Sequence, residues 1–374
     1  MSDQTTTPGR FGRLYQGLTT VDFVGRKRTW FTISILIIVI GLASLGVRGF
    51  NLGIDFKGGN SWEMVNVPHT SISAVTSAVT KAGLAQPSVE KLGSDTYEVT
   101  ADLNSYSQAQ QTAITDKVAA AMANAAGIGV NQVSSSSVGP TWGGEITNRA
   151  LEALIIFFIA VVGYISVRFE PKMAAAAFIA MLHDLLVTIG VYSLFGLQIT
   201  PDTVIAILTI LGYSLYDTVV VFDRVRDNTG GVLKSGDLNY SEMVNLSMNQ
   251  TLARSINTSL VAILPVFSVL IVGAYVLGAT TLQSYGLALS VGLLSGAYSS
   301  IFIASPLLAI LKEREPRFKE LALRVASRTD ATHRMLTPAA AARLGAEGAQ
   351  RAVKSTLPSS SRGVIARPRK PKRR

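Results

Sequence analysis

Cysteine is absent from this 374-residue sequence, which excludes disulfide bridges, zinc–thiolate sites and thiol nucleophiles. The three histidines, His69, His183 and His333, are too far apart to match any metal-ligand spacing, so we predict no metal site. Charge is also scarce: 16% of the residues are charged and 48% are hydrophobic, whereas a typical soluble domain has roughly 25% charged residues. At this length, the deficit argues against an ordinary cytosolic enzyme.

Nucleotide-binding and nucleophile motifs are missing as well. The fragment Gly127–Gly129 lacks the third glycine of a dinucleotide fingerprint, and Gly212–Ser214 lacks the closing glycine of a nucleophile elbow. No group of residues has the spacing of a catalytic site. We therefore expect a protein that is not an enzyme, with no catalytic residues and no cofactor.

The formal net charge of +10 comes from one segment of the chain. Residues 312–374 hold 17 Lys and Arg against 5 Asp and Glu, while the remaining residues hold 17 against 19. Because this segment is also rich in Ala, Ser and Pro and lacks hydrophobic periodicity, we predict a basic, mostly disordered cytoplasmic tail over residues 312–374. Its simplest role is to fix membrane topology; contact with anionic lipid or ribosomal RNA is the alternative.

Long apolar blocks are the strongest positive signal in the sequence. A membrane-spanning helix needs about 20 predominantly apolar residues. Six blocks are candidates: Trp30–Val47, Ala153–Val167, Met173–Leu197, Thr203–Phe222, Ser255–Leu277 and Thr280–Leu311. We predict transmembrane helix 1 over residues 30–47 and helices 2 to 6 within residues 149–311. We expect helix 2 to begin near Ile146 and Pro306 to kink or end the last helix.

The charges around these blocks predict the topology. The first block is longer than a signal-peptide core of about 7–15 residues and no A-x-A site follows it, so we interpret it as an uncleaved anchor. Segment 1–29 and the loops after helices 2 and 4 carry Lys and Arg, whereas the loops after helices 3 and 5 carry none. Because basic loops face the cytoplasm, we predict a multi-pass membrane protein with both termini in the cytoplasm and residues 48–148 outside.

The segment 48–148 is polar and long enough for a small domain. Its pattern alternates strand and helix signals in the order β-α-β-β-α-β. We expect strands at 60–67, 88–92, 97–101 and 130–138, and helices at 71–82 and 106–126. This order predicts a ferredoxin-like α+β domain outside the cytoplasm. An irregular α+β lid is the alternative.

Ionisable residues inside the apolar blocks are the candidate functional residues. A charge at the centre of the bilayer costs about 2.5–3.5 kcal/mol, so it is normally kept for a partner or a function. Asp217 lies well inside the fourth block, Asp184 lies beside His183 in the third, and Arg254 immediately precedes the fifth. We predict that Asp217, Arg254, Asp184 and His183 form a proton-coupling site in which Asp217 is the proton-responsive residue. The alternatives are a fixed Asp217–Arg254 salt bridge and, for His183–Asp184, an interhelical hydrogen-bond anchor.

Glycines mark the exit from the first block. Gly53, Asp55, Gly58 and Gly59 belong to a segment that follows helix 1 directly. Paired glycines permit positive φ and close backbone approach, so we predict a stiff connection into the external domain.

Four stretches together resemble a known family. They are LGIDFKGG at Leu52–Gly59, VGPTWGGEI at Val138–Ile146, LGYSLYDTVVVFDRVRDN at Leu211–Asn228 and NQTLARSINTS at Asn249–Ser259. With six expected spans and one small external domain, the chain resembles the SecF subunits of the SecD/SecF protein-export family. It departs from the family pattern at Tyr216, where Asn is frequent, and in its long basic tail.

The resemblance implies a function that the residues alone do not give. SecF-like subunits pair with SecD into a twelve-helix bundle similar to the RND superfamily, and they work with the SecYEG channel and YajC in the bacterial plasma membrane. The pair uses the proton-motive force to promote export of unfolded preproteins. The family's functional charges fall on Asp217 and Arg254, and we expect Asp184 and Asp217 to face the second bundle. The alternatives are half of an RND-type proton-driven solute or lipid exporter and a scaffold without ion coupling.

Overall fold

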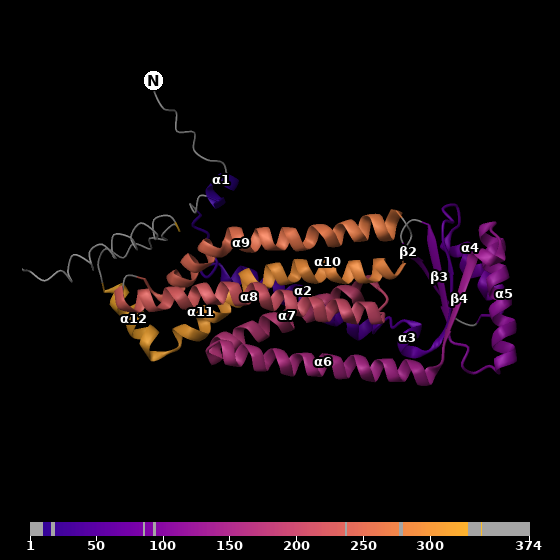
Figure 1. Ribbon diagram of the computed structural model, residues 1–374, viewed down its shortest axis with the longest axis horizontal. Coiled ribbons are helices and arrows are strands. Elements are labelled where there is room, and N and C mark those ends of the chain that lie inside the picture. The colour runs from indigo at the N-terminus through magenta and orange to yellow at the C-terminus, as the bar shows by residue number, and fades with distance from the viewer. Residues whose placement is uncertain are drawn as a thin grey trace, which may run out of the picture.

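Six helices of membrane-spanning length form an elongated bundle, and a small sheet lies at one end of it (Figure 1). The computed structural model describes residues 10–15, 19–84, 87–92, 95–235, 238–276, 280–327 and 338. Two spans are α2 (Lys27–Arg48) and α6 (Pro140–Arg168); α7 (Pro171–Phe195) and α8 (Pro201–Ser235) are the next two. The fifth span consists of α9 (Tyr240–Ser268) followed by a π-helical segment, η2 (Val269–Val276). The sixth span consists of α10 (Thr280–Ser299), the π-helical turn η3 (Ser300–Ala304) and α11 (Ser305–Glu313).

The helix ends follow from local sequence signals. Pro140 and Pro171 stand at the first positions of α6 and α7, where the missing N–H costs no hydrogen bond. A capping box of Asn239 and Glu242 starts α9, and Gly196 ends α7 in a left-handed conformation.

Two predicted boundaries are wrong. The second span begins at Pro140 rather than near Ile146, because its first turns are polar and extend beyond the apolar block. Pro306 does not end the last span, which continues to Glu313; the helix is instead irregular just before this proline, at the π-helical turn η3.

The sheet domain that follows α2 has the predicted ferredoxin-like topology. Its strands are β1 (Gly59–Met64), β2 (Ser88–Leu92), β3 (Thr96–Ala101) and β4 (Val133–Val138), and its helices are α4 (Ile72–Lys81) and α5 (Gln108–Ala126). The strand order is β2-β3-β1-β4, and every neighbouring pair is antiparallel. This is the split βαβ arrangement, so the alternative of an irregular lid is wrong.

The two faces of the sheet differ in chemistry. Trp62, Met64, Tyr97 and Val99 are fully or almost fully buried beneath α4 and α5, which cover the face away from the bundle. Residues at alternate positions point the other way, as the period of a strand requires. On this side, Asn51 Nδ2 donates a 2.8 Å hydrogen bond to Glu90 Oε1 from the loop after α2. The second face therefore meets the bundle.

A row of three glutamates crosses this second face. Glu98 on β3 stands directly opposite Glu63 on β1 and Glu90 on β2. Burial and the negative charges of Glu90, Glu63 and Asp55 raise the pKa of Glu98 to about 7. Like charges on directly opposed strand residues destabilise a sheet, so this row weakens the domain at alkaline pH.

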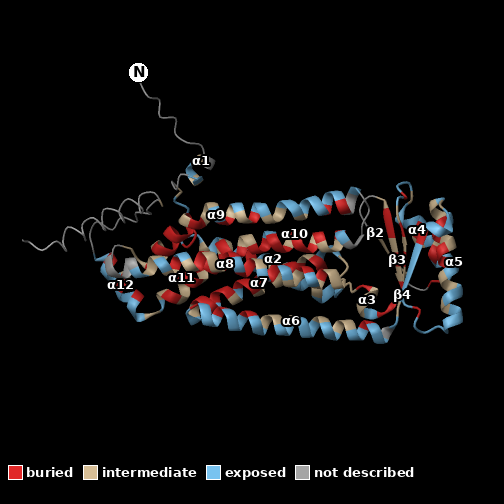
Figure 2. Cartoon of the chain, viewed as in Figure 1, coloured by how far each residue is buried: buried red, intermediate tan, exposed pale blue. Residues whose placement is uncertain are grey.

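Burial in the bundle is uneven (Figure 2). The α7 and α10–α11 spans are mostly buried, whereas α2 and α6 expose most of their surface. Glycines allow the closest contacts: a Cβ on Gly41 of α2 would lie 2.6 Å from Gly190 Cα of α7, and one on Gly292 of α10 would lie 2.2 Å from Ile210 Cδ1 of α8. Small residues thus set the packing of helices in this bundle.

The predicted disordered tail begins with an ordered helix. The helix α12 (Pro316–Ala326) buries Phe318, Leu321 and Val325, a pattern of helical periodicity, and packs against the bundle. Lys312, which is buried, contacts Glu170 and lies 3.3 Å from Glu315 Oε1. The rest of the predicted tail, Pro338 excepted, lies outside the described residues.

Candidate functional site

A fully buried carboxyl, Asp184, lies at the centre of the bundle. Three serine hydroxyls donate hydrogen bonds to it from two other helices: Ser214 of α8, and Ser295 and Ser299 of α10, the last two at 2.7 Å. Each carboxyl oxygen accepts at least one of these bonds. The carboxyl thus links α7 to α8 and α10, and the protein itself supplies hydrogen-bond donors to both of its oxygens.

His183 belongs to the same site but faces a different neighbour. Its Nδ1 lies 3.1 Å from Asp184 Oδ1, and its ring stacks on Tyr298 with centroids 6.1 Å apart. Its Nε2 is buried and has no hydrogen-bond partner among the described residues. The predicted interhelical anchor is therefore formed by Asp184 with the serines, while His183 contacts the carboxyl from the same helix.

Asp217 of α8 is the second buried carboxyl, with 2% of its surface exposed. Ser300 donates a hydrogen bond to its Oδ2. The hydroxyl of Ser255 on α9 lies beside the same carboxyl, but it makes no hydrogen bond of good geometry. Asp217 thus has fewer donors than Asp184, although the two carboxyls are buried to a similar degree.

The two carboxyls are joined through adjacent residues of one helix. Ser299 donates to Asp184 and Ser300 donates to Asp217. Ser300 is also the first residue of the π-helical turn η3. The irregular turn therefore begins between the donors to the two carboxyls, and π-turns are frequent at functional sites.

Arg254 is not paired with Asp217. It is exposed on α9, and no ion pair within 4 Å joins the two, although its charge acts on the carboxyl at longer range. The alternative of a fixed salt bridge is therefore wrong for this structure. The expected orientation of Asp184 and Asp217 toward a second bundle is also wrong, because the serines enclose both carboxyls within this chain. Tyr216, the departure from the family pattern, is 52% exposed and points to the bundle surface.

The glycine segment follows α2 and connects the sheet to α6 and to the residues just before α8. Gly53 donates from its N–H to Ile199 O at 2.9 Å, just before α8, and precedes the short helix α3 (Ile54–Lys57). A Cβ on Gly143 of α6 would lie 2.9 Å from Gly58 N, so α3 packs on α6 at backbone distance. Gly58 and Gly59 have positive φ, and a Cβ on Gly59 would lie 2.9 Å from Ala101 O in β3. The predicted stiff connection is thus a four-way junction.

Asp55 lies in this junction on α3. Burial raises its pKa, and the nearby negative charge of Asp202, at the start of α8, raises it further. Because Gly143 lies against Phe56 and Gly58, the first two resemblance stretches, Leu52–Gly59 and Val138–Ile146, meet in space although about 80 residues separate them in the chain.

The fourth stretch fixes the segment before α2. Asn249 of α9 accepts a 2.9 Å hydrogen bond from Val21 N and donates one of 2.9 Å to Val21 O. Asn245, one turn earlier, accepts hydrogen bonds from the backbone of Phe23 and Val24 at 3.0 Å. These asparagines satisfy an otherwise unpaired backbone in the interior.

Sequence reasoning missed the serines around the carboxyls. Ser214, Ser295 and Ser299 stand in apolar spans, where small residues are expected for packing alone. The spacing of Ser295 and Ser299, one helical turn apart on one face, was the available signal for a polar site. It does not identify the partner, since Asp184 lies more than 100 residues earlier in the chain.

Two family models match the chain. The model described as "Protein export membrane protein SecD/SecF, C-terminal" matches residues 117–314, and the "SecD/SecF GG Motif" matches residues 43–61. The second match includes Gly53, Asp55, Gly58 and Gly59. The first includes both buried carboxyls and Arg254.

Curated relatives and solved structures agree with these models. "Protein translocase subunit SecF" of Streptomyces coelicolor is 42% identical over 313 residues, which cover 84% of this chain and 82% of the relative. The Mycobacterium tuberculosis protein of the same name is 42% identical over 326 residues, covering 84% and 72%. A crystal structure of SecDF, a translocon-associated membrane protein from Thermus thermophilus, has a TM-score of 0.70 at 29% identity, covering 80% of this chain. The matched region is 39% of that SecDF chain.

Proposed function

Because the chain belongs to the SecD/SecF family of protein-export membrane proteins, we propose that it is a subunit of a protein translocase whose work is driven by a proton at Asp217. The observation that carries this proposal is the pair of buried carboxyls joined through Ser299 and Ser300 at a π-helical turn. An ionisable group inside a membrane bundle is retained for a partner or for ion transfer.

The different hydrogen bonding of the two carboxyls suggests different roles. Asp184 accepts hydrogen bonds from three hydroxyls, which hold its carboxyl in a fixed position. Among the described residues, Asp217 accepts a hydrogen bond of good geometry from Ser300 only, at Oδ2, so its Oδ1 is available to a proton. Arg254 is near enough to influence the Asp217 charge without neutralising it in a salt bridge. We assign Asp217 as the proton carrier, Arg254 as its electrostatic modulator, and Asp184 with His183 as the fixed support.

The π-helical turn η3 is an element with two backbone arrangements, π-helical and α-helical. If η3 converts to regular α-helix, the residues after Ser300 shift in register relative to Ser299 by one position. Protonation of Asp217 removes the charge that Ser300 solvates and so favours a different arrangement of α10 and α11 against α8. A proton thereby changes helix packing.

The glycine junction provides the connection to the external domain. It is hydrogen-bonded to the backbone of Ile199 just before α8, packs against α6 and continues directly into β1. A movement of α8 relative to its neighbours would therefore reach the sheet through Gly53, Asp55, Gly58 and Gly59. Their close backbone contacts leave little room to absorb such a movement.

The complete assembly in this proposal contains a SecD-like subunit, the SecYEG channel and YajC. It lies in the bacterial plasma membrane, has both termini of this chain in the cytoplasm and uses the proton-motive force to export unfolded preproteins. The names of the relatives support a translocase role, and the match to only 39% of the SecDF chain is consistent with a second bundle. Contacts of the basic tail with lipid or ribosomes stay a prediction. No observation favours a solute or lipid exporter, because the curated relatives reported above are protein translocase subunits.

The test is Asp217→Asn in inverted membrane vesicles that contain the whole translocase. We expect the variant to co-purify normally with the SecD-like subunit and to lose the stimulation of preprotein export by a proton gradient. The matched control is Asp223→Asn, which removes the same charge on the same helix but from a partly exposed ion pair with Arg168 and Arg226. The control should retain stimulation.

Two outcomes would contradict the proposal. If Asp217→Asn retains wild-type stimulation under the gradient, Asp217 carries no driving proton. If the variant fails to assemble, Asp217 is a structural contact, and a scaffold without ion coupling becomes the better account.

A further inference from the structure

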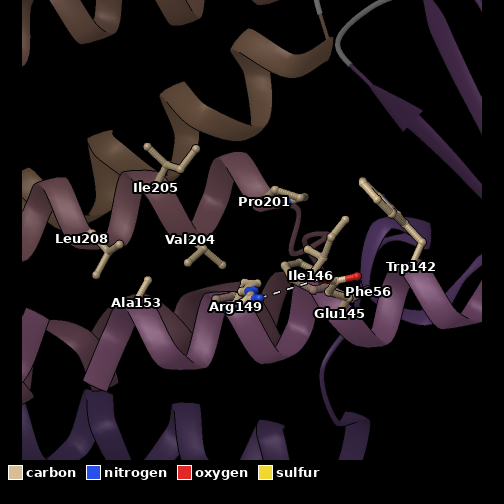
Figure 3. A pocket seen from close by; sticks show the side chains of 11 residues that line it. Phe56, Trp142, Glu145, Ile146, Arg149, Ala153, Pro201, Val204, Ile205 and Leu208 are labelled. Atoms are coloured by element: carbon tan, nitrogen blue, oxygen red, sulfur yellow. Dashed lines mark ion pairs between the residues drawn. The ribbon is translucent and has the colours of Figure 1, made fainter. Parts of the chain in front are cut away.

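A crevice separates α6 from the start of α8, in a region that the proton site does not reach (Figure 3). Its volume is about 420 Å³. Apolar side chains form its walls, among them Ala153 of α6 and Val204 and Leu208 of α8. At the end nearest the sheet it is lined by Trp142, Glu145 and Arg149. The crevice is therefore apolar at one end and charged at the other.

The position of the crevice matches the boundary between lipid headgroups and hydrocarbon. The charged residues in the first turns of α6 end at Glu152, and an uncharged apolar stretch runs from Ala153 to Val167, just before Arg168. From Trp142 to Ala153 the helix rises about 16 Å, and from Pro201 to Leu208 about 10 Å. One leaflet contributes roughly 15 Å of hydrocarbon, so the crevice extends from the headgroup level into the upper part of one leaflet. Trp142, 62% exposed on the first turn, is typical of the aromatic belt at this level.

Charges of both signs meet at the polar end. Arg149 lies 3.9 Å from Glu145 and 3.0 Å from Glu152, and 71% of its side chain is exposed. An exposed guanidinium can bind a phosphate, and an exposed carboxylate can bind an ammonium group. A ligand that complements this end has both groups close together, as a zwitterionic phospholipid headgroup does.

A transmembrane helix of a partner does not fit the crevice. A helix with its side chains is at least about 10 Å wide, so a 10 Å length occupies roughly 800 Å³. This is nearly twice the volume of the crevice. A single hydrocarbon chain is much thinner, and the volume lies within the range of ordinary small-molecule sites.

We infer that this crevice binds one zwitterionic phospholipid from the leaflet next to the sheet. An acyl chain lies between Ala153 and Leu208, the phosphate contacts Arg149, and the ammonium group contacts Glu145. The lipid fills the space that α6 leaves beside α8 and supports the helix on which the glycine junction rests.

The first test is native mass spectrometry of the full-length protein purified with phosphatidylethanolamine. Ala153→Phe fills the apolar part of the crevice and is expected to lower the fraction that retains one lipid by about tenfold, which corresponds to ~1.4 kcal/mol. The control, Ile159→Phe, adds a similar ring to a 67% exposed position on the same helix and should leave retention unchanged. Val204→Phe, from the opposite wall, should repeat the loss if Ala153→Phe fails to fold. Equal retention in the crevice variants and the control would overturn the proposal.

A second test separates a specific lipid from the general lipid surface. Since the chain has no cysteine, Leu208→Cys and Ile159→Cys each provide a single site for a fluorescent label. In liposomes, brominated phosphatidylethanolamine should quench the label at position 208 more than brominated phosphatidylglycerol does at the same mole fraction. At position 159, the two lipids should quench the label equally. Equal quenching at 208 would show ordinary lipid contact only. Loss of quenching at 208 on adding the partner subunit would show that a protein segment occupies the crevice; either result refutes the proposal.

Discussion

Glu98 should make the ferredoxin-like domain less stable as the pH rises, and Glu98→Gln should remove this dependence. Glu98 stands between Glu63 and Glu90 on the neighbouring strands, and the charges that act on it strongly, those two and Asp55, are all negative. Glutamine keeps the size of the side chain and can accept and donate hydrogen bonds, but it cannot ionise. The substitution therefore isolates the cost of the charge.

The sign and size of the effect follow from the pKa. Glu98 has a pKa of about 7 in the folded protein, compared with an ordinary value of 4.5. Between these values the unfolded chain loses its proton while the folded domain keeps it, so the free energy of unfolding falls as the pH rises from 4.5 to 7. At 1.36 kcal/mol per pH unit the upper limit is about 3 kcal/mol. Partial solvent exposure of the side chain reduces this to roughly 2 kcal/mol.

The assay is hydrogen exchange of the backbone amides of β1 and β3 in the full-length protein, corrected for intrinsic rates, at pH 5, 7 and 8.5. We expect Glu98→Gln to raise the free energy of opening of the sheet at pH 8.5 and to leave it nearly unchanged at pH 5. Asp116→Asn is the control, because it removes an exposed carboxylate from α5 of the same domain. An equal effect of Glu98→Gln at all three pH values, or a loss of stability at pH 8.5, would refute the reasoning.

Gly292→Ala should destabilise the bundle by about 1–3 kcal/mol in detergent unfolding, because the new Cβ would lie 2.2 Å from Ile210. In an Ile210→Ala background, Gly292→Ala should lower the free energy of unfolding by less. Gly163→Ala should change this free energy little, because Gly163 has open space around it. Equal losses of stability in all three cases would contradict the packing account. Residues 48–148 expressed alone should give a mixed α/β circular dichroism spectrum and a cooperative melt, since the domain has its own buried core. An all-helical spectrum would contradict the topology.

The membrane spans and the topology of the ferredoxin-like domain could be predicted because their signals are local. An apolar block indicates a span wherever the rest of the chain lies, and the alternation of strand and helix signals fixed the order of elements. The extension of α8 to Ser235 was missed because residues beyond Phe222 are polar. Asn228 in this extension donates hydrogen bonds to Ser247 and Gln250 of α9, a stabilisation that no local pattern reveals.

The candidate site was only partly predictable for a related reason. The cost of a charge in the membrane identified Asp184 and Asp217, but not what surrounds them. Their serine partners are small residues from distant spans, and only the packing of α7, α8 and α10 brings them together. The absence of an Asp217–Arg254 salt bridge was equally hidden, because topology places both on adjacent helices without fixing the direction of either side chain.

Proton exchange at Asp217 is the central claim, and infrared difference spectroscopy tests it most directly. The full-length protein, reconstituted with its SecD-like partner, is compared between low and high pH, and the carbonyl band of a protonated carboxyl is assigned by its loss in Asp217→Asn. We predict a band that disappears as the pH rises, is absent from Asp217→Asn and persists in Asp184→Asn. A spectrum in which Asp217→Asn removes no titrating carboxyl band would contradict the account.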